Sequence, residues 1–394
     1  MPILVLRISV LLAAILAAAP LAAQNLRPQD DATAPSTPAK PKSRVVLVEK
    51  PALVSRFQVD EAAVAVEFNR ALMALTRKNS VTEAWRSLVS PADVVGLKIN
   101  TAGGSILCTH PALVEAIVAG LEKSGIPPEQ VVIWDKFEDQ MLAAGYVPMQ
   151  PSKEWRCQSV VPGAGFDGEK FFFHEIAGQL IWGDRDFIGK VEKSNNTLRQ
   201  LLEQAAAPRK NESLDPFRDN SAPKDGKKEP PPQVSNRSYF ARILTRDVTK
   251  IINLPVLSDH DRIGLSGCLS SLTLGSIDNQ RRFLNDSQAA AEAIADLYSN
   301  ELISKKTILH VMDGLVCQYA GGPAFNPHYA ASPGLLMLST DPVALDTLAL
   351  ERIEDGRRSR GVIPVSAKAG HIAEAALAGL GNNKPELIEI TVIP

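Results

Sequence analysis

The sequence has few aromatic residues and no excess of basic charge. Aromatic side chains make up 5% of its 394 residues, and 42 Lys and Arg residues are balanced by 44 Asp and Glu residues. Proteins that bind nucleic acid usually present a basic face, and those that bind single strands stack the bases on aromatic rings. We therefore expect no nucleic-acid partner.

Three short motifs of common enzyme and metal-site families are missing as well. The chain contains no GxSxG, no HExxH and no CxxC, which argues against the usual serine hydrolases, zinc proteases and iron–sulfur carriers. We expect no iron–sulfur cluster. The four cysteines, Cys108, Cys157, Cys268 and Cys317, allow zero, one or two disulfides in an oxidising compartment. Small buried thiols without a function are an equally good interpretation.

Long hydrophobic runs are absent except near the N-terminus. Arg7 precedes the apolar residues 8–19, and small residues continue to Ala23. This pattern is typical of a secretory signal peptide over residues 1–23, and the run is too short to span a membrane comfortably. We predict a periplasmic or extracellular protein without a transmembrane span in its mature chain.

Two segments lack the apolar content needed for folding. Residues 24–43 are rich in Pro, Ala and polar side chains, and we expect a disordered linker there. Residues 208–238 are charged and Pro-rich, and we expect them to be disordered within an insertion at about residues 150–240, which also holds a predicted hairpin over 166–173. The remainder of 44–394 is long enough for a large core.

That remainder alternates strands with helices. Apolar runs predict strands, segments with a period of 3.6 predict helices, and a strand–helix–strand unit of this spacing joins parallel strands. The pattern predicts an α/β fold with a largely parallel central sheet and flanking helices. The predicted strands are 44–49, 94–99, 131–134, 250–254, 308–312, 335–338 and 387–393, and the predicted helices are 60–77, 111–123, 137–144, 196–206 and 367–380.

Polar loops follow five of these strands, and ligands of open α/β sheets bind at the carboxyl ends of strands. The amides of a glycine-rich loop and the N-terminus of the helix after it suit an anion, to which a lysine would add a full charge. A structural role stays open, because glycines turn chains and Thr or His residues cap helices. The loop over 98–110 contains Lys98, Asn100, Gly103, Gly104, Thr109 and His110.

Other strand ends supply titratable side chains. Asp135 ends one predicted strand and Asp313 follows another, where a carboxylate can act as a base, orient a histidine or bind a metal. A helix cap is the other interpretation of Asp135. His260 stands between two aspartates, and it is the better candidate because neighbours in an extended segment face opposite ways. Asp341 is typical of a helix cap, whereas Asp346, one turn further on, has no such role.

The segments VVGLKINTAGGS, IINLPVLSDHDR, VMDGL and STDPVALD together resemble the bacterial and archaeal family called domain of unknown function family 362. The resemblance extends from about Val94 to the C-terminus, apart from the Pro-rich stretch. It implies no established general activity, although some members carry a ferredoxin-like cluster domain and many are exported. By position it supports Lys98, Asn100, Thr109, His110, Asp135, His260, Asp313, Gly322, Pro323, Asp341 and Asp346 as motif residues.

The sequence departs from that family pattern at two places. Many members have Lys where Ser258 stands and another Lys near Ser271. Anion contacts or lysine chemistry at those places are therefore missing here. The cluster cysteines are absent too, which argues against electron transfer by this chain alone.

Our leading interpretation is an exported α/β protein with an enzyme-like site at the strand carboxyl ends. His110, His260, Asp135 and Asp313 are the candidate catalytic residues, and the same four are candidate ligands of a divalent metal. Two alternatives stay open: a non-catalytic module that binds a carboxylate or phosphate compound, and a scaffold that captures a protein partner through 208–238. The candidate binding residues for an anionic small molecule are Lys98, Asn100, Gly103, Gly104, Thr109, Gly322 and Asp346.

Overall fold

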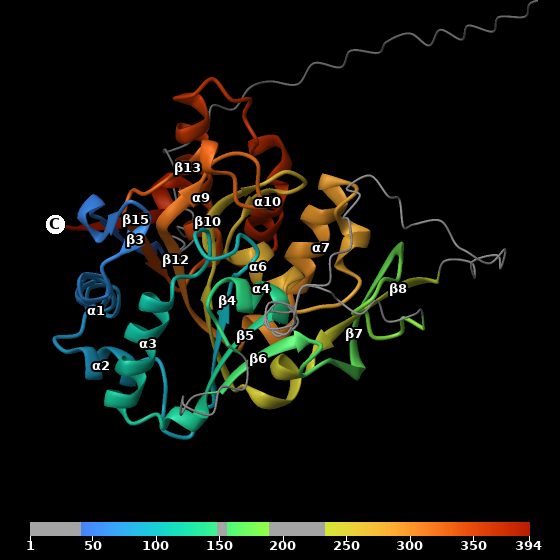
Figure 1. Cartoon of the computed structure of the whole chain (residues 1–394), viewed down its shortest axis with the longest axis horizontal. Helices are drawn as coiled ribbons and strands as arrows, with labels where there is room; N and C mark the ends of the chain where they lie inside the picture. The colour runs from blue at the N-terminus through green and yellow to red at the C-terminus, as the bar shows by residue number, and fades with distance from the viewer. Residues whose placement is uncertain (1–40, 148–155, 189–232) are drawn as a thin grey trace, which may run out of the picture. The chain divides into compact units, whose positions relative to one another are not determined.

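A computed structural model of the chain describes residues 41–147, 156–188 and 233–394. Within them a mainly parallel sheet of eleven strands carries helices on both faces (Figure 1), which confirms the predicted fold class. The strands are β1 (Ser43–Glu49), β4 (Val95–Ile99), β5 (Val131–Phe137), β6 (Arg156–Val161), β9 (Lys250–Leu254), β10 (Val256–His260), β11 (Gly264–Ser266), β12 (Thr307–Gln318), β13 (Ala330–Ala331), β14 (Leu335–Ser339) and β15 (Ile388–Ile393).

The sheet brings the ends of several strands to one edge. Its main path is β15-β1-β14-β12-β9-β4-β5-β6, with β10 and β13 attached to β12 and β11 attached to β10. All neighbours from β12 to β6 are parallel. Their carboxyl ends therefore meet at one edge, which we call the carboxyl edge. β14 runs antiparallel to both β12 and β1, so the prediction that its loop joins the others at that edge was wrong.

Two helical layers cover the sheet. α1, α2 and α3 share one core with Val95, Leu97 and Ile99 of β4, while α6, α7, α9 and α10 share the core on the other face. In Figure 1, α1 to α3 and α7 with α10 lie on opposite sides of the strands. The helices are α1 (Glu61–Thr76), α2 (Val81–Arg86), α3 (Pro111–Ser124), α4 (Glu138–Ala143), α6 (Cys268–Leu274), α7 (Ser287–Ser299), α8 (Glu301–Ser304), α9 (Pro342–Arg358) and α10 (Gly370–Leu377).

Local sequence signals explain where these helices start and stop. α9 begins at Pro342 after the cap Asp341, whose carboxylate accepts hydrogen bonds from the backbone N–H groups of Val343 and Ala344. This confirms the predicted cap, which typically contributes about 1 kcal/mol. α3 ends before Gly125, which adopts a φ of 103° that only glycine reaches without strain.

The insertion differs from its prediction. Residues 166–173 form no hairpin of their own, because they belong to one strand, β7 (Phe166–Gln179), which pairs antiparallel with β8 (Val234–Ala241). β8 includes residues 234–238, which the sequence had suggested were disordered. The predicted helix over 196–206 lies outside the described residues, as do the signal peptide and nearly all of the linker.

The turn before β7 and the first residues of β7 have the spacing GxGxxG, over residues 163–168. In dinucleotide-binding loops a helix follows such glycines directly, and its N-terminus holds the pyrophosphate. Here β6 leads through the loop into β7 with no helix between them. The Arg185 guanidinium also crowds Gly168, where a Cβ would lie 2.6 Å from Nη2. The loop therefore lacks the helix that a dinucleotide site needs.

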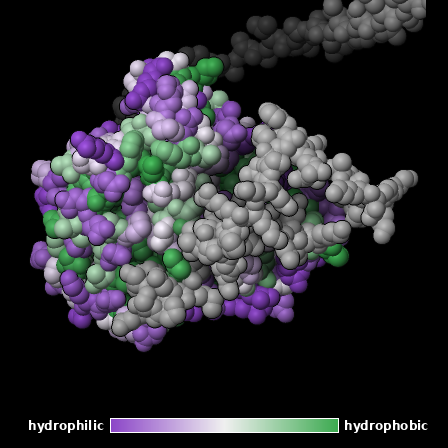
Figure 2. Space-filling model, viewed as in Figure 1, coloured by the Kyte–Doolittle hydropathy of each residue, from purple (hydrophilic) through white to green (hydrophobic). Residues whose placement is uncertain are grey.

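Short elements complete the fold. All four cysteines are free thiols, which fits the interpretation without disulfides. Every helix in the described ranges is too short or too polar to cross a membrane. On the face seen in Figure 2, hydrophilic residues are mixed with smaller apolar areas. The short elements are β2 (Val54–Ser55), β3 (Gln58–Val59), η1 (Pro51–Leu53), η2 (Pro128–Gln130), η3 (Ile243–Asp247), η4 (Gln280–Phe283), η5 (Pro327–Tyr329), η6 (Ser366–Lys368) and η7 (Pro385–Leu387).

Candidate functional site

The loop between β4 and α3 is fastened to the carboxyl edge. The Thr109 hydroxyl accepts a hydrogen bond from the Asn100 backbone N–H at 2.8 Å and donates one to the last carbonyl of β9 at 2.6 Å. Gly104 has a φ of 72°, and a Cβ on Gly103 would lie 2.3 Å from the Leu107 carbonyl oxygen. Both glycines are therefore required by the shape of the loop. Thr109 links the loop to the sheet and has no free hydroxyl proton for a ligand.

Asp313 lies inside β12, not after the strand as predicted, and it is fully buried. Its carboxylate accepts the backbone N–H of His110 at 2.8 Å and that of Leu315 at 3.1 Å, and it lies 3.0 Å from Nδ1 of His110. His110 is 6% exposed. Its other ring nitrogen, Nε2, is buried and has no hydrogen-bond partner among the described residues. An imidazole held at Nδ1 by a carboxylate and unbonded at Nε2 is arranged as a general base.

Charge and burial set the protonation of this pair. Burial lowers the pKa of His110, but the charge and the hydrogen bond of Asp313 raise it, and the net shift is upward. Burial and the charge of Asp313 raise the pKa of the nearby Cys108 to about 12. The Cys108 thiol thus stays protonated at neutral pH and is a poor nucleophile. Of these two side chains, His110 is the one that can exchange a proton near neutral pH.

Lys98 and Asp135 form a second buried pair at the same edge. The Lys98 Nζ lies 2.7 Å from Oδ1 of Asp135 and 2.6 Å from the carbonyl oxygen of Ile99. Oδ2 of Asp135 accepts hydrogen bonds from the backbone N–H of Thr101 at 2.9 Å and from its hydroxyl at 2.7 Å. Both carboxylate oxygens therefore have protein donors. The pair ties β4, β5 and the loop together, and it offers neither a free cation nor a free carboxylate.

A small cleft opens beside the loop. Its volume is about 10 Å³, room for about one water or one ligand oxygen. Ser258 and Ser266 are register partners in β10 and β11, and Asn100 Nδ2 donates to the Ser266 hydroxyl at 3.3 Å. Val256 pairs with Asp313, so the cleft borders the strand that carries Asp313, while His110 and Asp313 lie behind its lining. The lining residues are Asn100, Ala102, Gly103, Leu107, Val256, Ser258, Ser266 and Pro323.

Gly322 and Pro323 form another wall of this region. The Gly322 N–H donates to Oδ1 of Asp259 at 2.9 Å, and a Cβ on Gly322 would lie 2.1 Å from the Asp259 carbonyl oxygen. Only glycine fits so close an approach. Arg357 Nη1 lies 3.6 Å from the other carboxylate oxygen of Asp259. Gly322 thus shapes the site, while Pro323 lines the cleft.

The family model for domain of unknown function 362 (DUF362) matches residues 175–351. The chain carries a DUF362 domain. The match contains His260, Asp313, Gly322 and Asp346 and begins after Asp135, so it covers less of the chain than the resemblance suggested. No curated protein matches the chain. A crystal structure of a Thermotoga maritima protein is similar, with 11% identity and a TM-score of 0.37, over 77% of this chain and 60% of that one.

His260 of the DUF362 domain has partners of its own. Its Nδ1 accepts the Arg262 backbone N–H at 3.2 Å and lies 3.3 Å from Oδ1 of Asp261. In the described parts of the chain, no group of three or more His, Cys, Asp or Glu side chains is placed to hold a metal ion. The structure therefore does not gather the four predicted metal ligands into one set; these are His110, Asp135, His260 and Asp313. Asp135 pairs with Lys98, and His260 faces Asp261.

Asp346 of the DUF362 domain, which the sequence predicted as a ligand-binding residue, contacts another helix. It is fully buried in α9, and its carboxylate accepts the backbone N–H groups of Cys268 at 2.6 Å and Leu269 at 3.0 Å. Burial raises the pKa of Asp346 to about 7, against the opposing effect of these two amides. The residue caps α6 from a neighbouring helix, which is a structural role.

Sequence reasoning missed Ser266 and Val256 and treated Ser258 only as a departure from the family pattern. These residues meet because the chain turns sharply between β10 and β11 and ends the turn at Gly264, whose φ is 79°. The signal that was available is the polar segment before a glycine between two short apolar runs, which is typical of a hairpin. It predicts the turn but not which hydroxyls face the cleft.

Proposed function

We propose that this DUF362 chain binds a small oxygen-bearing organic compound at the carboxyl edge and exchanges a proton with it through His110. The observation that carries the proposal is the His110 ring, fixed at Nδ1 by the buried Asp313 and unbonded at Nε2 among the described residues. An unpaired buried polar atom is costly in a fold. The unpaired nitrogens of His371 have no carboxylate partner, whereas the His110 ring combines an unbonded Nε2 with a carboxylate at Nδ1, and this combination favours a ligand or a reacting group.

The lining of the cleft supports a neutral oxygen group of the ligand. Its polar side chains are an amide, Asn100, and two hydroxyls, Ser258 and Ser266. The charge of Lys98 is neutralised by Asp135, so that side chain offers no free charge to an anion. A hydroxyl or carbonyl oxygen fits both the donors and the volume of about 10 Å³.

The chemistry follows from the two ring nitrogens of His110. With the Nδ1 proton held by Asp313, the lone pair of Nε2 accepts a proton from the ligand, and Asp313 stabilises the imidazolium that forms. The same nitrogen returns the proton in the reverse step. Asn100 and Ser266 orient the oxygen of the ligand during the transfer. A positioned acid–base group of this kind typically contributes about 10²–10⁴-fold in rate.

A ligand screen with the purified chain tests this proposal. Small alcohols, ketones and amides are titrated against isotopically labelled protein, and compounds that shift the signals of Asn100 and Ser266 should also shift the ring signals of His110. Exchange of solvent deuterium into such a compound is then measured with the wild type and with His110→Gln.

We expect the exchange rate to fall by at least about 10²-fold in His110→Gln, with binding to the cleft retained. Equal exchange rates in both proteins would refute proton transfer by His110. A screen in which cleft ligands leave the His110 ring signals unchanged would refute the shared site. Loss of binding in Ser266→Ala with normal folding would support the cleft as the binding position.

A further inference from the structure

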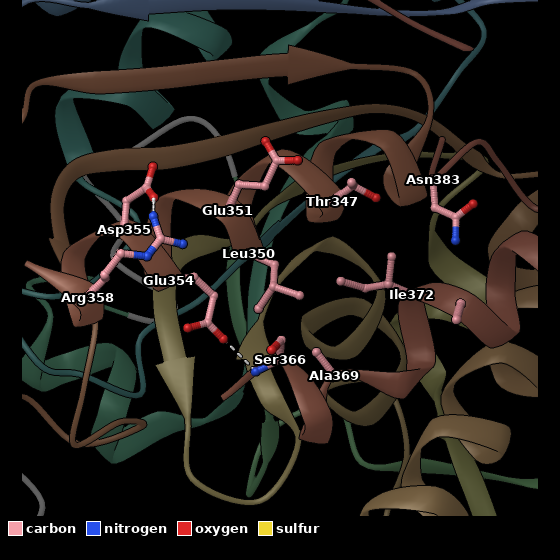
Figure 3. A pocket seen from close by; sticks show the side chains of 11 residues that line it. Thr347, Leu350, Glu351, Glu354, Asp355, Arg358, Ser366, Ala369, Ile372 and Asn383 are labelled. Atoms are coloured by element: carbon pink, nitrogen blue, oxygen red, sulfur yellow. Dashed lines mark hydrogen bonds and ion pairs between the residues drawn. The ribbon is translucent and has the colours of Figure 1, made fainter. Parts of the chain in front are cut away.

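A long groove lies between α9 and α10, apart from the cleft at the carboxyl edge. Its volume is about 600 Å³ (Figure 3). On α9 the lining runs from Thr347 to Arg358 on one helix face, which is roughly 17 Å at about 1.5 Å per residue. The groove is therefore long enough for about three turns of a second helix. It is lined by Thr347, Leu350, Glu351, Glu354, Asp355, Arg358, Ser366, Ala369, Ile372, Ala373 and Asn383.

The floor of the groove is apolar. Leu350 of α9 and Ile372 of α10 point toward each other across it in Figure 3, with Ala369 beside them. Leu377 stands one turn after Ala373 on α10 and is 83% exposed, so it continues the apolar stripe beyond the groove. Contiguous exposed apolar area with a polar rim, rather than a single exposed residue, marks an interaction site, and Leu377 extends the apolar area of the groove in this way.

One wall of the groove is acidic. Oε1 of Glu354 accepts the backbone N–H groups of Val365 and Ser366, which fixes its position but leaves its charge. Asp355 pairs with Arg358 at 2.8 Å. Glu351 is exposed, and within the described ranges it has no ion-pair partner. Three carboxylates against one guanidinium give the groove a net negative charge.

We propose that this groove binds a basic, amphipathic segment of another protein in helical form. Apolar side chains at positions i, i+3 and i+4 of that segment lie on Leu350 and reach the bottom of the groove, where Ile372 is 6% exposed. Its Lys or Arg side chains meet Glu351 and Glu354. The charge complementarity selects a basic partner over an acidic one. The length and open shape of the groove suit a peptide segment better than a compact small molecule.

The proposal is tested with the full chain and three synthetic probes. One probe is a short amphipathic peptide of Lys, Leu and Ala with leucines at helical spacing, the second has Glu in place of every Lys, and the third is spermine. Binding is measured by fluorescence anisotropy and calorimetry at low and moderate salt. The variants are Glu351→Lys in the groove and Glu122→Lys on the exposed surface of α3, which makes the same charge change on the other face of the sheet.

We expect the basic peptide to bind, the acidic peptide to bind at least about tenfold more weakly, and salt to weaken the binding. Glu351→Lys should lose at least about tenfold in affinity and Glu122→Lys none. Leu350→Asp, checked for folding by circular dichroism, should abolish binding. Equal affinity for both peptides, or an unchanged affinity in Glu351→Lys, would overturn the proposal. Spermine binding as tightly as the peptide would overturn it in favour of a small-cation site.

Discussion

One strand carries two buried polar sites with different properties. On the face covered by α6 and α7, His310 of β12 has both ring nitrogens occupied: Nε2 lies 3.0 Å from the Tyr298 hydroxyl, and Nδ1 lies 3.2 Å from the Asn253 amide. Burial lowers the pKa of His310 to about 3. Three residues further on, Asp313 holds His110 at Nδ1 and leaves Nε2 unbonded.

The two sites differ in their hydrogen bonding, which marks His310 as structural, whereas for His110 we propose a chemical role. Burial alone makes His310 a neutral hydrogen-bonding link, since no carboxylate stabilises its charged form. The carboxylate beside His110 reverses the sign of the pKa shift. The Lys98–Asp135 pair is structural in the same sense as His310, because both carboxylate oxygens of Asp135 accept hydrogen bonds within the protein. A carboxylate at one ring nitrogen together with an unbonded second nitrogen distinguishes His110 from these sites.

The largest effect should come from Asp135→Ala. The substitution leaves the Lys98 ammonium buried without its carboxylate and removes both bonds to Thr101. Removing one partner of a buried pair typically costs about 3–5 kcal/mol in the free energy of unfolding. Urea unfolding followed by circular dichroism measures this loss. A loss below about 1 kcal/mol would show that the pair is not structural, and Thr347→Ala in the groove is a control of small expected effect.

Asp313→Asn should have the next largest effect. The amide keeps one acceptor oxygen for the backbone donors of His110 and Leu315 but lacks the negative charge. We expect a loss of about 1–3 kcal/mol in stability and a lower pKa of His110, since the charge that raised it is gone. Urea unfolding and a titration of the His110 ring by NMR measure the two effects. An unchanged pKa would contradict the assignment of Asp313 as the group that raises it.

His310→Gln should change how stability depends on acid pH. In the wild type the folded-state pKa of His310 is about 3, below the usual value near 6.5, so the unfolded chain takes up a proton that the folded chain does not. Stability from this residue therefore falls as the pH drops below about 6.5, by up to about 1.4 kcal/mol per pH unit. The variant should lack this contribution when the free energy of unfolding is measured between about pH 6.5 and 5.5. If the free energy depends on pH with the same slope in both proteins, His310 does not have the lowered pKa.

His110→Gln should give the smallest change in stability. The pH dependence of this change should have the opposite sign to that of His310→Gln. The folded-state pKa of His110 is raised, so its stabilising contribution is fully present below the usual pKa near 6.5 and is lost as the pH rises through the folded-state value. The stability of the wild type relative to the variant should therefore decline above about pH 6.5. A difference that grows with pH would contradict the pairing with Asp313.

The periodic parts of this fold were accessible from the sequence. The strand over 94–99 and the helix over 111–123 were predicted almost to their ends, because apolar spacing and the residues Pro111 and Gly125 report local structure. The direction of β14 was not accessible, since an apolar run looks the same in either orientation and strand order depends on distant contacts. The match to DUF362 names the family without adding a reaction.

The sequence predicted which residues lie at the site better than it predicted their roles. The pairing of His110 with Asp313 across 203 positions depends on tertiary structure. Both residues were chosen from their places after strands and from the family resemblance, neither of which pairs them. Lys98 and Asp135 were chosen on the same grounds, but they neutralise each other. A sequence shows that two charges exist, whereas only the fold shows whether they face a ligand or one another.

The tautomer of the neutral His110 ring decides whether Nε2 can accept a proton from a ligand. Nitrogen-15 NMR of the labelled chain above the pKa of His110 reports which ring nitrogen carries the proton. We expect Nδ1 to be protonated toward Asp313 and Nε2 to carry the lone pair and to respond to cleft ligands. A proton on Nε2 in the neutral ring, with Nδ1 as the unprotonated nitrogen, would contradict it.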